Sequence, residues 1–222
     1  MLRSRCARLG FLVAPLAALA CSTPAGGRAA VAALGFDDGS LDGWSRAATG
    51  GSGPLATWAI RADSAAVSAP NVLAMVASNH ASEDRYNVCW SRALAFGDGE
   101  LAVDVRADGG ELDQGGGPMW RVQDANNYYV CRFNPLESNY RVYVVKDGVR
   151  RQLATALVDA RAGSWHRIAV RHVGDAITCS LDGRKFLEVS DATIARPGGV
   201  GVWTKADART SFDELAVSSE RR

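Results

Sequence analysis

Alternating hydrophobic and polar residues recur in short runs from Leu34 onward, and they predict β-strands rather than helices. The clearest runs occupy residues 101–107, 119–123, 128–134, 140–146, 166–173, 177–183 and 199–204. Asp-Gly pairs, which suit tight hairpin turns, stand at 38–39, 42–43, 98–99, 108–109, 147–148 and 182–183. Many short strands at nearly even spacing are typical of sandwiches and jelly rolls. The sequence therefore predicts one all-β domain over residues 34–222, a two-sheet antiparallel jelly-roll sandwich.

Strand alternation also sorts the side chains onto two faces, because successive residues of a strand point in opposite directions. If the apolar positions are buried, one open, concave sheet face carries Arg121, Gln123, Tyr128, Arg132, Asn134, Trp203 and Lys205. Aromatic rings cover the apolar face of a pyranose, and amides and guanidinium groups satisfy its hydroxyls. We predict that these seven residues bind a sugar. The alternative is an ordinary solvated face that carries two aromatic residues.

The first twenty residues have the pattern of a signal peptide. Three arginines precede an apolar stretch, residues 9–20, that is too short to span a bilayer. Ala18-Leu19-Ala20 fits the small-x-small rule for cleavage before Cys21, and Cys21 itself resembles the lipid acceptor of bacterial lipoproteins. Residues 21–33 then predict a flexible tether. We expect an exported protein, periplasmic or in the outer envelope, with membrane contact only through a lipid on Cys21.

The charge balance argues against partners that are strongly charged. The chain has 25 Lys and Arg residues and 24 Asp and Glu residues. Residues 1–20 contain three of the arginines and no acid, so their removal leaves 22 positive against 24 negative groups. This balance gives no attraction for nucleic acid or for anionic lipid.

Several motifs then suggest a family. The segments "WRVQDANNYY", "NPLESN" and "GVGVWTKAD" resemble exported bacterial proteins with a concanavalin A-like (laminin G-like) jelly roll. They are similar to the domain of unknown function often labelled 3-keto-disaccharide hydrolase, over about residues 34–218. The resemblance implies a fold, an extracytoplasmic location and a link to carbohydrate. Because one sandwich hosts many activities, three classes stay open: a carbohydrate-binding module, an enzyme that cleaves a disaccharide-like glycoside, and a structural or protein-interaction module of the envelope.

A search for catalytic motifs gives only weak candidates. Family 16 glycoside hydrolases share this fold and use Glu-x-Asp-x-x-Glu on one strand, but here Glu111 and Asp113 are followed by Gly116. That departure argues against their double-displacement mechanism. If the protein is an enzyme, we expect the catalytic residues among Asp113, Asp124 and Glu137. Asp124 is also a natural turn residue that caps backbone N–H groups.

No cofactor and no catalytic metal is expected from the sequence. An alternative that stays open is a structural Ca²⁺ ion, because pairing of the terminal strands would bring together Asp37, Asp38, Asp213 and Glu214.

The cysteines of the domain are odd in number, at positions 89, 131 and 179. Alternation places Cys131 and Cys179 among apolar neighbours and separates Cys89 from Cys131. We therefore predict that they form no intramolecular disulfide.

The signal-peptide interpretation makes one prediction about the mature chain. Protein from a bacterial envelope fraction should begin at Cys21, and its intact mass shows whether lipid has been added. A chain that still carries Met1 would contradict export. A chain that begins at an unmodified Cys21 would support secretion and exclude the anchor.

Overall fold

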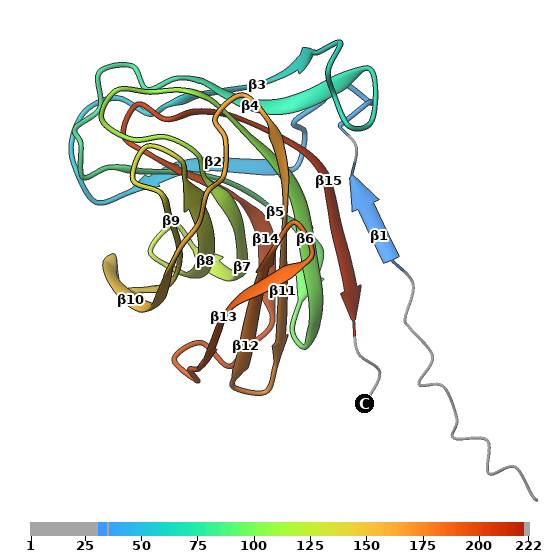
Figure 1. Ribbon diagram of the computed structural model, residues 1–222, viewed down its shortest axis with the longest axis vertical. Coiled ribbons are helices and arrows are strands. Elements are labelled where there is room, and N and C mark those ends of the chain that lie inside the picture. The colour runs from blue at the N-terminus through green and yellow to red at the C-terminus, as the bar shows by residue number, and fades with distance from the viewer. Residues whose placement is uncertain (1–30, 35, 220–222) are drawn as a thin grey trace, which may run out of the picture.

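The computed structural model describes residues 31–34 and 36–219, which form two antiparallel sheets packed face to face (Figure 1). The described residues contain no helix, and thus none that could cross a membrane. The strands predicted from alternation are all present, and the predicted all-β jelly roll is confirmed. The predicted signal peptide and Cys21 lie outside the described residues.

One sheet has eight strands in the order β13-β12-β11-β6-β15-β4-β3, with β1 beside β15. These strands are β1 Val31–Leu34, β3 Thr57–Ala62, β4 Asn71–Ala77, β6 Gly99–Gly109, β11 Trp165–Val173, β12 Ala176–Leu181, β13 Arg184–Ser190 and β15 Arg209–Ser219.

The other sheet has seven strands in the order β10-β9-β8-β7-β14-β5-β2. These strands are β2 Trp44–Thr49, β5 Tyr86–Phe96, β7 Gly117–Asp124, β8 Asn127–Asn134, β9 Asn139–Lys146, β10 Val149–Leu157 and β14 Gly198–Lys205. The candidate site described below belongs to this sheet.

The Asp-Gly pairs form hairpin turns where both residues can adopt a positive φ. Asp147-Gly148 has φ values of 52° and 78°, and Asp182-Gly183 has 51° and 78°. Two positive φ values are those of a type I′ turn, whose twist matches the flanking strands. Two expectations are wrong: Asp108-Gly109 ends β6 instead of turning, and residues 31–33 of the predicted tether pair with β15.

The central strands of the seven-stranded sheet are buried on both faces, whereas its edge strands β10 and β2 are partly exposed. Its inner face contributes to the main core between the sheets, together with side chains such as Leu73 and Val103 of the eight-stranded sheet. Its other face, called the outer face below, carries a second apolar cluster of Val88, Trp90, Met119, Val122, Tyr128, Val130, Tyr143, Val145 and Trp203. Polar groups on either face must therefore find partners within the protein.

The three cysteines of the domain are buried free thiols, which confirms the predicted lack of a disulfide. The expectation that alternation separates Cys89 from Cys131 is wrong. Cys89 and Cys131 both lie in the core between the sheets and are not on opposite faces. Burial raises the pKa of the Cys89 thiol to about 12, so it is unreactive at neutral pH.

Tyr129 of β8 fixes the loop between β13 and β14 against the sheet. Its hydroxyl donates to Asp191 Oδ1 over 2.6 Å and accepts from the Ile194 N–H over 3.1 Å. Arg151 also donates to Asp191 Oδ2 over 2.7 Å. Burial alone would raise the pKa of Asp191, but the hydrogen bonds from Tyr129, Arg151 and Thr193 outweigh it and hold the pKa at about 2.

This low pKa predicts an acid-dependent contribution to stability. The folded pKa lies below the unfolded value of about 3.9, so the stabilisation is complete above that value and is lost as the pH falls toward 2. Asp191→Asn should lower the free energy of unfolding at pH 7, and its difference from the native protein should shrink between about pH 4 and pH 2. Urea titrations at several pH values measure it. Asp147→Asn, at an exposed hairpin, is the control; a constant difference for Asp191→Asn would contradict the assignment.

Candidate functional site

Most of the residues predicted to lie on an open face are buried instead. Tyr128, Asn134 and Trp203 have no exposed surface, and Arg121 and Arg132 are 1% and 2% exposed. Only Gln123 and Lys205 of the predicted seven keep a partly exposed surface. The prediction of a solvated face of rings and amides is therefore wrong, because the outer face carries its own apolar cluster.

The polar atoms of Tyr128 and Trp203 are satisfied inside this cluster. Trp203 Nε1–H donates to the Tyr128 hydroxyl over 3.2 Å, and that hydroxyl lies 2.9 Å from Thr49 Oγ1. Thr49 in turn donates to the Ala125 carbonyl, so the Tyr128 hydroxyl donates to Thr49. Neither ring offers a free polar atom to a ligand.

Arg121 leaves the predicted face because of a β-bulge. Its φ of 48° lies in the left-handed region, and the register of β7 with β8 shifts between Trp120 and Asp124. The extra residue reverses the alternation, so Val122 joins Met119 on the outer face. The Arg121 guanidinium instead donates to the carbonyls of Gly97, Gly174 and Ile194 and to the Asp98 carboxylate.

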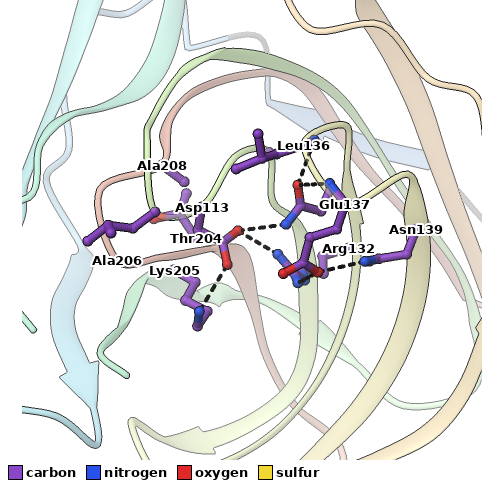
Figure 2. A network of polar contacts seen from close by, with 12 residues as sticks. Asp113, Arg132, Leu136, Glu137, Asn139, Thr204, Lys205, Ala206 and Ala208 are labelled. Carbon is purple, nitrogen blue, oxygen red and sulfur yellow. Dashed lines mark hydrogen bonds and ion pairs between the residues drawn. The ribbon is translucent and has the colours of Figure 1, made fainter. Parts of the chain in front are cut away.

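Four charged residues converge at one end of the outer face (Figure 2). Arg132 Nη1 lies 2.6 Å from Asp113 Oδ1, and Lys205 Nζ lies 3.1 Å from Asp113 Oδ2. Arg132 Nη2 lies 3.4 Å from Glu137 Oε2. We call Asp113, Arg132, Glu137 and Lys205 the charged network. Two of the three catalytic candidates, Asp113 and Glu137, thus share one guanidinium.

Glu137 forms the solvent edge of the charged network, with 44% of its side chain exposed. Asn139 Nδ2 and Arg141 Nη1 contact the same oxygen, Oε2, at 2.6 Å and 3.3 Å. In the described part of the chain no contact engages Oε1. Partial burial raises the pKa of Glu137, but the Asn139 hydrogen bond and the charges of Arg132, Arg141 and Lys205 outweigh it, so the pKa lies below its usual value. Glu137 is therefore an ionised acceptor that solvent can reach.

Hydrogen bonds from side chains and from the backbone hold the two carboxylates in place. Asn134 Nδ2 donates to Asp113 Oδ1 over 3.2 Å, while Asn134 Oδ1 accepts the N–H groups of Leu136 and Glu137. The Asp207 carboxylate accepts the N–H groups of Glu111, Leu112 and Asp113. The three loops that follow β6, β8 and β14 are thus tied together around the network.

The ring of Trp203 lies under two guanidinium groups. Arg132 Cζ is 5.7 Å and Arg150 Cζ is 5.9 Å from the ring centroid. Arg150 also lies 4.5 Å from the rings of Tyr86 and Tyr143. Arg150 and Tyr86 are partly exposed, so they form the surface of the outer face above the buried rings. Both residues are absent from the set predicted from sequence.

Gln123 and Asp124 lie apart from the charged network. They line a cleft of about 300 Å³ together with Asn127, Lys146, Thr193, Ile194, Ala195 and Arg196. The Asp124 carboxylate accepts from the Asn126 N–H and from the Asn127 side chain, as the turn interpretation predicts. Asp124 therefore does not lie with the other two catalytic candidates, Asp113 and Glu137.

The acidic residues proposed for calcium do not form one cluster. Asp37 and Asp213 both bind Ser68, through its hydroxyl and its N–H, while Asp38 accepts from the Ser40 N–H. Among the described residues there is no group of three or more metal-binding side chains. The calcium ion remains an untested prediction.

Comparison with known proteins supports the fold and identifies a family. The sequence model of a family described as the 3-keto-alpha-glucoside-1,2-lyase-like domain matches residues 33–217. No curated protein matches the chain.

Solved structures share the sandwich at low sequence identity. The carbohydrate binding module CBM66 from Bacillus subtilis has a TM-score of 0.60 at 17% identity, over 79% of this chain and 95% of its own. The cellulose induced protein Cip1 has 0.59 at 12% identity, over 86% and 98%. The Bacillus licheniformis beta-glucanase has 0.54 at 12% identity, also over 86% and 98%. These similarities are similarities of fold.

Because Arg132 is buried against a carboxylate, its loss should destabilise the protein. Arg132→Met leaves Asp113 buried with Lys205 as its only cationic partner, and breaking a buried ion pair costs about 3–5 kcal/mol. Urea denaturation should show a loss of that order. The matched control is Arg141→Met, since Arg141 is 31% exposed and surface ion pairs contribute about 0–1 kcal/mol. Equal stability of Arg132→Met and the native protein would show that the charged network does not support the fold.

Proposed function

The chain belongs to the family of 3-keto-alpha-glucoside-1,2-lyase-like domains, and we propose that it binds carbohydrate at the charged network of the outer face. The observation that carries the proposal is the arrangement of Glu137 and Lys205. An ionised acceptor, 44% exposed, and a cationic donor, 15% exposed, belong to one network of ion pairs that holds both in place, and the charge of Lys205 acts on Glu137. A sugar hydroxyl both donates and accepts, so such a pair can satisfy it fully.

Neighbouring side chains complete the proposed site. Tyr86 is partly exposed, and its ring, over which the Arg150 guanidinium lies at 4.5 Å, gives a pyranose a surface to stack on once that side chain turns away. Arg141 is also partly exposed beside Glu137 and adds a second donor. Of the residues predicted from sequence, Lys205 contacts the ligand directly in this proposal, while Arg132 and Asn134 position Asp113 and Glu137.

The proposed location is extracytoplasmic. It is supported by the signal-peptide pattern of residues 1–20 and by the acceptor pattern at Cys21. A sugar-binding sandwich on a tether would present its outer face to glycans of the envelope or of the surroundings.

A second candidate function is glycoside cleavage, which the family description and the ionised Glu137 favour. In a 3-keto glucoside the ketone acidifies the C2 hydrogen. A carboxylate such as Glu137 could take that proton, a C1–C2 double bond would form, and the C1–O bond would break as the alcohol leaves with a proton. Mass spectrometry of the products from a 3-keto disaccharide decides between binding and cleavage; cleavage should vanish in Glu137→Gln.

Glu137→Gln also tests the binding proposal, because it keeps the shape and removes the charge. A sugar identified on a glycan array should bind about 5- to 150-fold more weakly to the variant, as expected when a hydrogen bond worth about 1–3 kcal/mol is lost. Calorimetry measures the affinity, and the thermal midpoint should change little because Glu137 is 44% exposed and the buried Arg132 keeps its ion pair with Asp113.

The matched control is Glu188→Gln, an exposed carboxylate paired with Lys185 on β13 in the other sheet. It should leave the affinity unchanged. Equal weakening by both variants, or none by Glu137→Gln, would place the sugar elsewhere.

A further inference from the structure

We infer that the preferred ligand is an acidic sugar, such as a uronate, and that Arg150 binds its carboxylate; this inference rests on the proposed function. Arg150 follows the Asp147-Gly148 turn on β10, an edge strand of the seven-stranded sheet. It pairs in register with Val145, so its side chain lies on the outer face. There its guanidinium covers Tyr86, Tyr143 and Trp203.

The charges on this face do not cancel. Asp113 is held by Arg132 and Lys205, and Glu137 is held by Arg132 and Arg141. Four cations thus face two carboxylates when Arg150 is included. Arg150 forms no ion pair in the described part of the chain, and its contacts are with aromatic rings. The excess is positive, although the chain as a whole is close to neutral.

Hydrogen-bond donors without an acceptor also indicate an anionic ligand on this face. Arg150 Nη1, Arg132 Nε and Trp90 Nε1 are buried and have no acceptor within the protein. A buried donor without an acceptor costs free energy comparable to a lost hydrogen bond. All three residues lie on the outer face. Two buried acceptors there, Asn139 Oδ1 and Asp113 Oδ2, also lack a hydrogen bond, but Lys205 Nζ lies 3.1 Å from Asp113 Oδ2. The three donors still outnumber the acceptors, so the face suits a ligand rich in acceptors.

A sugar carboxylate meets both conditions. It brings negative charge and two acceptor oxygens, and a guanidinium binds it through two parallel hydrogen bonds. Because Arg150 stands on an edge strand and is partly exposed, its side chain can turn from the rings toward the ligand. The ring of Tyr86 would then be open to the pyranose. Arg150 is in this way a specificity-determining residue, and Glu137 and Lys205 bind the hydroxyls.

The test compares matched acidic and neutral sugars: the methyl glycosides of glucuronate and galacturonate against those of glucose and galactose. Calorimetry at low ionic strength should show roughly 10- to 100-fold tighter binding of an acidic sugar than of its neutral partner. Added salt should reduce the difference, since ions screen partly exposed charges. Arg150→Gln should remove the preference, and Arg150→Lys, which keeps the charge, should retain part of it.

Arg184→Gln is the matched control, because Arg184 also lies over an aromatic ring, at 4.7 Å from Phe186, but on β13 of the other sheet. It should keep the full preference. Equal affinity for acidic and neutral sugars, or a preference that survives in Arg150→Gln, would overturn the inference and leave the proposed function standing. Failure of every sugar on the array and in this set to bind would overturn both.

Discussion

A sheet whose central strands are buried on both faces must satisfy the polar side chains of those strands within the protein, and this constraint shapes the outer face. Arg132, Asp113 and Asn134 are at most 2% exposed, so each needs a partner at hydrogen-bond distance. The Asp113 carboxylate accepts hydrogen bonds from Arg132 and Asn134 and forms an ion pair with Lys205. The same contacts fix the chain segments that carry these residues. The pairing of charges therefore stabilises the end of the sandwich, and it holds Glu137 and Lys205 in place with part of each side chain exposed.

The same constraint explains why the aromatic residues are not an open platform. Trp203 and Tyr128 direct their polar atoms to each other and to Thr49, and guanidinium groups cover the ring of Trp203. Recognition is consequently expected at the rim of the cluster, where Tyr86 and Arg150 are partly exposed. The carbohydrate binding module and the beta-glucanase share the sandwich fold, while the proposed site of this chain depends on its loops and edge strands.

Local patterns were enough to predict the fold, since alternation and Asp-Gly turns act within a few residues. Local patterns gave wrong side-chain positions where a contact between distant segments determines the conformation. The left-handed residue Arg121 reverses the alternation in β7, and no local signal marks that bulge. The contact between Asp113 and Arg132 depends on a loop folding back against β8. Arg150, by contrast, could have been found: the Asp147-Gly148 hairpin places it opposite Val145, on the same face as Tyr143.

The central claim is that carbohydrate binds at the charged network rather than at the cleft around Gln123. Nitrogen-15 NMR tests it directly, because Arg132 Nε–H, Lys205 N–H and the Gln123 side-chain amide give separate signals. During titration with a sugar identified on the array, the signals of Arg132 and Lys205 should move and saturate together while that of Gln123 stays unchanged. Saturating shifts of the Gln123 amide, with Arg132 and Lys205 unaffected, would contradict the account.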